Sequence, residues 1–376
     1  MAYVTGLGDT RFGRLEGETT LSLMSSAAGA ALAEAGLARS DVDGLLCGYS
    51  TVFPHLMLST VFAEHFGLAP AYSHAIQLGG ATGCAMAMLA MRLVASGQCR
   101  HVLVVAGENR LTGQSRDRTV ESLAQVGHPD YELPFGPTIP AYYALVARRY
   151  LHEHDLREED LAGFAVLMRE NAGRHPGAHL RDPITPADVL ASRVIAAPLK
   201  LLDCCPISDG GAAFVVSAAP TGAHRLRLRG AGQATRHQHV SSIEVGDLGA
   251  GLAARRAFAE ASVTCEEIDL LAIYDSFTIT VLAQLEEIGF AHRGQAAALL
   301  REGVFGREGR LPLNTHGGLL SFGHCGVAGG MAHLLEAARQ LSGRAEARQA
   351  GERRLAFVHG DGGVLSAHVS LVLERE

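Results

Sequence analysis

Two stretches of the chain resemble each other, and this internal repeat constrains the possible folds more than any other feature. Gly80-Ala-Thr-Gly-Cys-Ala-Met-Ala-Met-Leu89 aligns with Cys325-Gly-Val-Ala-Gly-Gly-Met-Ala-His-Leu334. Both begin with small residues at an expected helix start, and each is followed by a helix, a glycine-containing turn and a strand. Self-similarity of this kind indicates a duplicated structural unit. We therefore expect two similarly folded halves, residues 1–220 and 221–376.

Short apolar runs alternate with segments of helical periodicity, which is the pattern of an α/β protein. The run His101-Val-Leu-Val-Val-Ala106 is apolar on both faces, as is typical of a central parallel strand. Strands are expected at residues 2–7, 42–47, 101–106, 212–217 and 226–230, and helices at residues 21–35, 81–96, 141–154 and 160–171. This order of elements predicts a layered α/β fold.

A long excursion interrupts the first half at about residues 108–200. Its first part, up to about Pro140, is rich in Gly, Pro, His and charged residues. Long loops in compact domains usually have a function. The prolines of residues 127–140 make that segment stiff. We expect it to form either a wall over a binding site or a contact between subunits.

The composition excludes several classes of protein. With 376 residues, 48% of them hydrophobic, the chain can bury a large core and is not extensively disordered. The formal net charge is −7, with acids and bases interspersed, which argues against a nucleic-acid-binding protein. Seven scattered cysteines without a Cys-x-x-Cys pair indicate a reduced, cytoplasmic protein. Neither a signal-peptide pattern nor a long apolar run is present, so no membrane span is expected.

The loop Gln77-Leu-Gly-Gly-Ala-Thr-Gly-Cys84 is rich in glycine and precedes an apolar helix. Glycine allows a ligand to approach the backbone closely, and the N–H groups of a helix start can hold an anion or an oxyanion. Close packing of the helix would select the same small residues. The sequence leaves both interpretations open.

Tyr274-Asp-Ser-Phe-Thr278 follows the apolar run from Leu270 to Ile273 and therefore stands at the carboxyl end of a strand. Open α/β sheets place their sites at such ends. Tyr274 and Asp275 can donate, accept and transfer protons. The alternative is that this segment only caps the next helix.

The segment Asn314-Thr-His-Gly-Gly-Leu-Leu-Ser-Phe-Gly-His-Cys-Gly326 mixes imidazole, hydroxyl, amide and thiol groups with glycines. A buried surface would not select this mixture, whereas a loop that brings an imidazole to a bound substrate would. His316, His324 and Cys325 lack a recognised zinc spacing, so no metal site is predicted. The pair Cys204-Cys205 is interpreted as two small residues in a buried turn, with a metal or redox pair as the alternative.

Taken in order, the motifs resemble those of the thiolase superfamily, in its sterol-carrier-type branch of thiolase-like proteins. The resemblance covers nearly the whole chain. It is carried by Gly6-Leu-Gly-Asp-Thr-Arg-Phe-Gly13, Gly79-Gly-Ala-Thr-Gly83, Ala106-Gly-Glu108, Pro134-Phe-Gly-Pro137, Ser208-Asp-Gly210, Tyr274-Asp-Ser-Phe277, Gly317-Gly-x-x-Ser-x-Gly-His324 and Gly360-Asp-Gly-Gly363. The resemblance implies a five-layered αβαβα architecture of two fused similar halves, a homodimer, coenzyme A thioesters as substrates and no bound cofactor.

The chain departs from the family pattern at both catalytic cysteines. The nucleophilic cysteine of the family precedes Ala-x-Gly, and this position is Gly80 here; Cys84 lies about one helical turn further on. The second cysteine, a base near the C-terminus, is missing from Val358-His-Gly-Asp-Gly-Gly363, where His359 or Asp361 would have to substitute.

Two other positions of the family pattern carry polar groups. The family imidazole is retained as His324, and Tyr274 matches the family Asn or His that orients a water or an oxyanion. Cys325 takes a position usually filled by proline.

The resemblance, together with the missing cysteines, implies a reaction that makes or breaks a carbon–carbon bond next to a thioester without an acyl-cysteine intermediate. Without a thiolate, no acyl-enzyme can form at Gly80. Retro-aldol cleavage needs only a base and donors that hold the thioester enolate. Thiolase-like proteins without the cysteine cleave hydroxylated steroid acyl-CoAs together with a small OB-fold partner of the DUF35 type, and we expect such a partner here.

Two alternatives remain open at this point. One is an acyltransferase that uses Cys84 or Cys325, and the other is a non-catalytic subunit that binds acyl-CoA or lipid. Across these hypotheses the catalytic candidates are His324, Tyr274, Asp275, Cys84, Cys325 and His316, and the expected substrate-binding residues are Gly80, Gly83, Asn314, Gly317, Gly318, Gly360 and Gly362.

Overall fold

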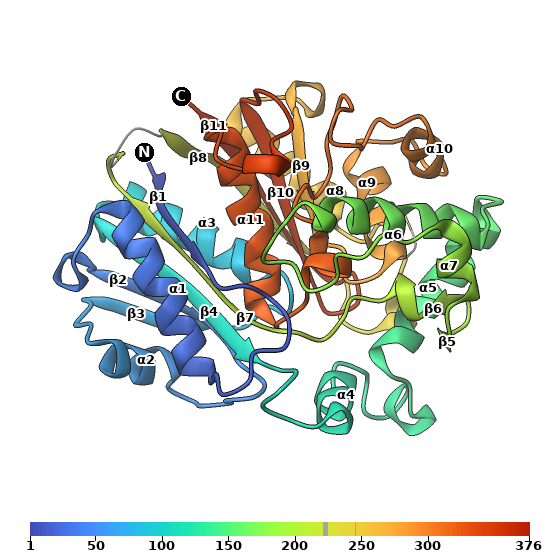
Figure 1. Cartoon of the computed structure of the whole chain (residues 1–376), viewed down its shortest axis with the longest axis horizontal. Coiled ribbons are helices and arrows are strands. Elements are labelled where there is room, and N and C mark those ends of the chain that lie inside the picture. The colour runs from blue at the N-terminus through green and yellow to red at the C-terminus, as the bar shows by residue number, and fades with distance from the viewer. Residues whose placement is uncertain (221–224, 245) are drawn as a thin grey trace.

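A single nine-stranded sheet runs through the molecule (Figure 1). The computed structural model describes residues 1–220, 225–244 and 246–376. The strand order is β3 (Tyr72–Ile76), β2 (Gly44–Gly48), β4 (His101–Asn109), β7 (Asp209–Ser217), β1 (Tyr3–Asp9), β8 (Leu226–Thr235), β11 (Ala367–Arg375), β10 (Leu355–Gly362) and β9 (Leu270–Ile273). The joint between β1 and β8 is short, with Tyr3 opposite Arg227 and Val4 opposite Leu226, so the sheet consists of two half-sheets.

Three layers of helix enclose these half-sheets. The outer layer on the first half-sheet contains α1 (Thr20–Ala35) and α2 (Leu58–Phe66), and the outer layer on the second contains α8 (Ala250–Ala261) and α9 (Thr278–Ile288). The central layer consists of α3 (Thr82–Ala95) and α11 (Val327–Leu341), which contact strands of both half-sheets. The α/β fold predicted from the sequence is therefore confirmed, and its layers follow the order αβαβα.

The strands are apolar on both faces because each half-sheet is covered on both sides. Along β4, Val102 and Val104 face the central helices, whereas Leu103 and Val105 face α1 and α2. Successive side chains of a strand point to opposite faces. A continuous run of Val and Leu therefore serves two separate cores, as the sequence of this strand predicts.

The excursion between β4 and β7 adds helices at one end of the molecule. They are α4 (Arg116–Ala124), α5 (Ile139–Glu153), α6 (Glu158–Gly173) and α7 (Pro186–Ala191), with the short strands β5 (Val194–Ala196) and β6 (Leu199–Lys200); α10 (Ala296–Arg301) packs on α6. The sequence predicts α5 and α6 but not α4. That helix is largely polar and has no apolar stripe, and its N-terminus depends on a local cap in which Ser115 accepts from the backbone N–H of Arg118.

Among the other elements that the sequence did not predict are α2 and the edge strand β3. Side chains of β3 are half-buried or exposed, so this strand lacks the apolar signal of the central ones. The expected start of the second half at residue 221 lies outside the described residues. Among the described residues, no helix is long and apolar enough to cross a membrane.

We expect Gly8 to be needed for the contact between β1 and α1. A Cβ at Gly8 would lie 2.1 Å from the carbonyl oxygen of Ala27, so Gly8→Ala has to push the helix away. The free energy of unfolding should fall by about 1–3 kcal/mol. In the matched control Gly29→Ala, on the open side of α1, the new methyl group meets nothing within 4 Å. There stability should rise by about 0.5–1 kcal/mol, because glycine is unfavourable inside a helix. Denaturant titration followed by circular dichroism measures both changes, and equal effects would contradict this assignment.

Candidate active site

A cavity of about 470 Å³ lies where the N-terminus of α3, the end of β9 and the loop before α11 come together. Residues of the excursion close it from the other side. The lining includes Tyr49, Gly79, Gly80, Arg110, Leu111, Arg116, Val120, Leu123, Ile139, Tyr143, Arg193, Ile195, Cys204, Cys205, Ile207, Tyr274, Ser276, Phe277, His324, Gly326, Asp361 and Gly363. Most of the wall is apolar, with a small number of polar groups at the α3 end, as is typical of small-molecule sites.

Tyr274 and His324 form a hydrogen-bonded pair in this cavity. The Tyr274 hydroxyl lies 2.9 Å from Nε2 of His324, and Nδ1 of that ring accepts from the backbone N–H of Gly326 at 3.3 Å. A neutral imidazole that accepts at Nδ1 carries its proton on Nε2. We therefore assign His324 as donor to the Tyr274 oxygen, which leaves the phenolic proton free to point toward a ligand.

The Tyr274 hydroxyl occupies the space above Gly80. A Cβ at Gly80 would lie 2.3 Å from this hydroxyl oxygen and 2.4 Å from the carbonyl oxygen of Asp361. Position 80 therefore has no room for a side chain. The resemblance expects a nucleophilic cysteine at this position, and the phenol of Tyr274 stands in the place of its thiol.

Burial fixes the protonation states of the pair. Desolvation, and next the nearby Arg110 guanidinium, lower the pKa of His324 to about 3, so its imidazole is neutral near pH 7. Desolvation also raises the pKa of Tyr274 well above its usual value, so the phenol keeps its proton. The pair is therefore a chain of two neutral hydrogen-bond donors.

Arg110 gives one wall of the cavity a buried positive charge. Its side chain is 4% exposed and pairs with Glu108, with 2.6 Å between Nη2 and Oε2. Burial alone would raise the pKa of Glu108, but Arg110 and hydrogen bonds from Thr51 and Val52 hold it below the usual value. The ion pair is neutral overall, but its positive member lines the cavity and Glu108 does not, so the orientation of the pair favours negative charge on a bound ligand.

Asp275, His316 and Asn314 lie behind the cavity and not in its lining. Asp275 accepts from the backbone N–H of Leu319 at 2.7 Å and from Nε2 of His333 at 3.1 Å, and so holds the π-helical turn Gly318–Phe322. His316 is buried against His333, with 4.8 Å between ring centroids. The Asn314 amide bonds both backbone groups of Ile273, each at 2.8 Å. The structure therefore places all three in the support of the loop that carries His324.

The two candidate thiols face the protein core. Cys84 is 3% exposed, and its Sγ would be 3.2 Å from a Cβ at Gly360, so it packs α3 against β10. Sγ of Cys325 would be 3.0 Å from a Cβ at Gly210 on β7. Burial raises the pKa of Cys84 to about 12 and that of Cys325 well above its usual value. Both thiols are therefore neutral near pH 7, and a neutral thiol is a weak nucleophile.

Among the glycines expected to bind substrate, Gly80 lies in the cavity lining. The others permit close packing. A Cβ would meet Met331 at Gly83, Ala172 at Gly317, the Asp275 carboxylate at Gly318, Ala81 and Cys84 at Gly360, and the carbonyl oxygen of Leu78 at Gly362. Most of these glycines are therefore required for close contacts between segments around the site.

Several polar residues of the lining were not candidates from the sequence. Tyr143 comes from α5, and Arg110, Cys205 and Ser276 come from separate loops. Tyr143 and Arg110 carry no motif of their own, whereas Ser276 and Cys205 stand in segments that the sequence analysis discussed, and only the fold brings the four to one cavity. The two residues suggested as substitutes for the second cysteine have different surroundings. Asp361 lines the cavity, whereas His359 is bonded to Ser370 and His368 inside the sheet.

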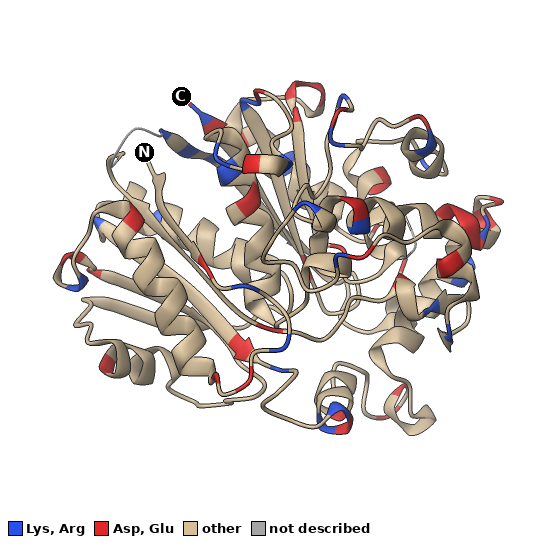
Figure 2. Ribbon diagram, in the orientation of Figure 1, with Lys and Arg blue, Asp and Glu red and all other residues tan. Residues whose placement is uncertain are grey.

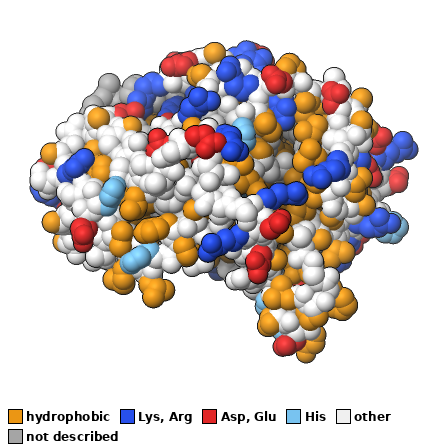
Figure 3. Space-filling view, turned by 60° about the horizontal axis from the view of Figure 1, so that its bottom comes forward, with side chains coloured by type: hydrophobic (Ala, Val, Ile, Leu, Met, Phe, Trp, Pro, Cys, Tyr) orange, Lys and Arg blue, Asp and Glu red, His pale blue; other side chains and the backbone are white. Residues whose placement is uncertain are grey.

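The first part of the excursion forms a projecting lobe. α4 and the segment after it hang below the body of the molecule in Figure 1, and Figure 3 shows hydrophobic side chains on this lobe. Tyr131 and Phe135 are 71% and 84% exposed. Residues of α4 line the cavity on its inner side, as do Ile139 and Pro140. The lobe is thus both a wall of the cavity and an exposed apolar surface.

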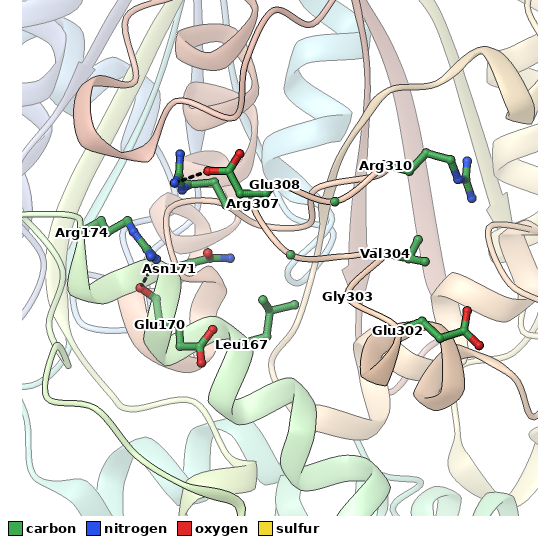
Figure 4. Close-up of a pocket in the computed structure, with 12 residues that line it drawn as sticks. Leu167, Glu170, Asn171, Arg174, Glu302, Gly303, Val304, Arg307, Glu308 and Arg310 are labelled. Atoms are coloured by element: carbon green, nitrogen blue, oxygen red, sulfur yellow. Dashed lines mark hydrogen bonds and ion pairs between the residues drawn. The ribbon is translucent and has the colours of Figure 1, made fainter.

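A second hollow, of about 490 Å³, lies between α6 and residues 302–310 (Figure 4). Its lining shares no residue with the cavity around Tyr274. It carries the same number of basic and acidic side chains, and Arg307 pairs with Glu308. Acidic and basic side chains are mixed over the rest of the surface as well (Figure 2). Within the described ranges, no three His, Cys, Asp or Glu side chains are grouped so as to hold a metal ion.

The fold and the site define a thiolase-type α/β protein with the Tyr274 hydroxyl next to Gly80. Family models agree with this assignment: "Thiolase, N-terminal domain" matches residues 2–219 and "Thiolase C-terminal domain-like" matches residues 232–375. The chain belongs to the thiolase superfamily, in its branch of sterol-carrier-type thiolase-like proteins.

The names of individual relatives include an acetyltransferase as well as a lyase and an aldolase. An acetyl-CoA acetyltransferase of Methanothermobacter thermautotrophicus is 30% identical over 97% of this chain and 98% of its own length. A 17-hydroxy-3-oxo-4-pregnene-20-carboxyl-CoA lyase of Mycobacterium tuberculosis is 32% identical, with 96% of each chain covered. Human sterol carrier protein 2 is 26% identical over 96% of this chain and 69% of its own. The solved structure of the Ltp2-ChsH2(DUF35) aldolase has a TM-score of 0.86 and 32% identity, and covers 100% of this chain and 97% of that one.

We expect that a cysteine cannot be restored at position 80 by a single substitution. In Gly80→Cys the new side chain collides with the Tyr274 ring, 2.2 Å from the added Cβ. Stability should fall by about 1–3 kcal/mol. Intact-protein mass spectrometry after incubation with acetyl-CoA should find no acyl adduct on either the wild type or the variant. A stable Gly80→Cys protein that acylates at residue 80 would contradict this prediction.

Buried histidines should make the fold sensitive to acid. Burial lowers the pKa of His175 and His368 to about 4 and that of His324 to about 3, while unfolded imidazoles titrate near pH 6.5. Below about pH 6.5 the unfolded chain therefore binds more protons than the folded chain, and the free energy of unfolding falls with falling pH. Melting temperatures measured from about pH 7 to pH 5 should decline. The decline should be shallower in His175→Asn, which keeps an acceptor for Gly177 but does not titrate.

Proposed function

We propose that the protein cleaves the carbon–carbon bond of β-hydroxyacyl-CoA thioesters in a retro-aldol reaction, without an acyl-enzyme intermediate. The observation that carries this proposal is the position of the Tyr274 hydroxyl, which is bonded to His324 and fills the space above Gly80. The activities named for the lyase and aldolase relatives support it further. Claisen-type chemistry through a thiol is disfavoured, because Cys84 and Cys325 face the core.

The reaction requires an environment that stabilises a thioester enolate. When the bond between the α- and β-carbons breaks, its electron pair moves into the thioester and places negative charge on the thioester oxygen. Tyr274 presents a phenolic proton that is polarised by His324, and Arg110 adds a buried positive charge. Preorganised donors in a site shielded from water can stabilise such an oxyanion strongly.

The apolar part of the cavity suits a hydrophobic acyl group. Leu123, Ile139, Ile195 and Phe277 line it on the side of the excursion. Arg116 and Arg193 also belong to the lining and can pair with phosphate groups of coenzyme A. No bound cofactor takes part in this mechanism, and coenzyme A enters as part of the substrate.

We further infer that the chain works in the cytoplasm as a homodimer with a small DUF35-type OB-fold partner, and that it divides into halves at residue 220. The DUF35 component named for the structural relative supports the partner. Exposed apolar side chains support interfaces with other chains, among them Leu56 at 97% and Phe135 at 84% exposure.

Substitution of the phenol and the imidazole tests the proposal. We expect Tyr274→Phe and His324→Ala to lower kcat by about 10²–10⁴-fold, because the first removes the donor to the enolate and the second removes the group that polarises this donor. Cys84→Ser is the matched control and should keep most of the activity. The assay follows release of the short acyl-CoA from 17-hydroxy-3-oxo-4-pregnene-20-carboxyl-CoA, with and without a DUF35 partner. A folded but inactive Cys84→Ser variant would contradict the retro-aldol proposal and favour an acyltransferase. If the wild type and all variants bind acyl-CoA but none turns it over, with or without the partner, a binding subunit is favoured.

A further inference from the structure

A second phenol lies in the same cavity as Tyr274 but comes from a different part of the chain. Tyr143 is on α5, and its ring stacks on Phe277 with 4.4 Å between centroids. Its hydroxyl donates to Oδ2 of Asp361 at 3.1 Å, and the carbonyl oxygen of Gly363 lies 3.0 Å away as a second acceptor. The cavity therefore contains two phenols, each bonded to a titratable side chain: Tyr274 to His324 and Tyr143 to Asp361.

The two phenols line the same cavity, and the backbone of Asp361 lies next to Gly80 as Tyr274 does. The Cβ that would be added at Gly80 lies 2.3 Å from the Tyr274 hydroxyl and 2.4 Å from the backbone oxygen of Asp361. Tyr143, Tyr274 and Asp361 all line the cavity. A ligand bound in this cavity is thus in reach of both phenols.

Asp361 is a buried carboxyl group that little else stabilises in its charged form. It is 1% exposed, and its Oδ1 has no hydrogen-bond partner among the described residues. His368 is nearest, with Nδ1 4.0 Å from Oδ1. This imidazole donates from Nε2 to the carbonyl of Leu365 and accepts from His359 at Nδ1. His368 is neutral, since burial lowers its pKa to about 4.

The form of Asp361 that accepts a proton is its carboxylate, to whose Oδ2 the Tyr143 hydroxyl donates, and burial makes this carboxylate a strong base. Desolvation raises the pKa of this carboxyl group well above its usual range. A neutral carboxylic acid is the favoured product when a proton arrives in such surroundings. The Tyr143 hydroxyl connects this acceptor with the open space of the cavity. Tyr274 and His324, the pair of the proposed function, are both donors, so the proton-accepting task of the reaction is still unassigned.

We propose that Tyr143, backed by Asp361, removes the proton of the substrate β-hydroxyl group and returns a proton to the α-carbon. This inference rests on the proposed retro-aldol function and assigns its proton transfers. Tyr143 is the catalytic residue in contact with substrate, and Asp361 is the positioning residue that acts through it.

The proton and electron count closes within the couple of Tyr143 and Asp361. The hydroxyl proton passes to the Tyr143 oxygen as the phenolic proton passes to Oδ2 of Asp361, and the electron pair left on oxygen forms the new carbonyl bond. The carbon–carbon bond breaks, and its electron pair enters the thioester enolate. Asp361 then returns its proton through Tyr143 to the α-carbon, where a C–H bond forms. No oxidant, reductant or further reactant is needed.

Exchange of the α-protons of propionyl-CoA in D₂O measures the proton transfer between Tyr143 and the α-carbon separately from cleavage of the carbon–carbon bond. The full chain, together with a DUF35 partner, should incorporate deuterium at the α-carbon, as followed by mass spectrometry. We expect Tyr143→Phe and Asp361→Asn to slow this exchange, and kcat for cleavage of 17-hydroxy-3-oxo-4-pregnene-20-carboxyl-CoA, by about 10²-fold or more. KM should stay within about threefold, because substrate binding does not depend on the proton transfer.

Tyr142→Phe is the matched control. The substitution removes the same oxygen atom from the neighbouring tyrosine on α5. The Tyr142 hydroxyl lies against Gly127, and Tyr142 lines a different hollow together with Tyr131 and Phe135. Exchange and cleavage should both be unchanged in this variant. Circular dichroism of all variants verifies that the fold is intact, and a structural role for Asp361 would appear as an increase of KM together with loss of stability.

The outcomes separate this inference from the proposed function. If Tyr143→Phe cleaves and exchanges at the rate of the wild type, the inference is overturned while the retro-aldol function stands. If the wild type exchanges α-protons through Tyr143 but never cleaves the β-hydroxyacyl-CoA, the couple is supported and the retro-aldol function fails. A wild type that does neither overturns both.

Discussion

The close packing of α3 and α11 between the two half-sheets is the constraint on which the rest of the structure depends. At Gly83 an added Cβ would lie 2.7 Å from Met331, and at Gly330 it would lie 2.8 Å from the carbonyl oxygen of Gly80. Helices this close require small residues at their crossing. Because both helices begin at the same end of the molecule, their approach brings Gly80, at the start of α3, next to His324, just before α11. The site is therefore a consequence of the central packing.

In the proposed function, a phenol in place of a thiol changes the reaction from acyl transfer to enolate stabilisation, while the packing of α3 and α11 stays the same. A cysteine above Gly80 would have to be charged to attack a thioester, whereas Tyr274 is neutral and buried, and acts as a donor. In a cavity shielded from water, a donor directed at a developing charge is effective because no solvent has to reorganise. His324 fits the same logic, since its lowered pKa keeps it neutral while Arg110 supplies the positive charge.

The residues that support the site show why a sequence motif can contain residues that do not line the cavity. Asp275 follows Tyr274 directly in sequence, yet it points behind the cavity and fixes the backbone of the turn Gly318–Phe322. Adjacent residues after a strand point in opposite directions, so one motif supplies both a cavity side chain and its support. Asn314 behaves similarly, since it bonds the backbone of β9 and sets where that strand ends.

The sequence by itself determined the α/β order and the internal repeat, and its resemblance to the thiolase family indicated that Gly80 stands where a cysteine is expected. These are local properties, read from alternation, glycine spacing and residue identity. Only the tertiary structure decided which side chains meet. His359 and Asp361 stand two residues apart and therefore on one face of β10, but His359 is covered inside the sheet while Asp361, at the strand end, reaches the cavity. Tyr143, more than two hundred residues away, becomes its partner through the folding of the excursion. The physical reason is that such contacts join segments far apart in the chain, and nothing in their local sequence encodes the approach.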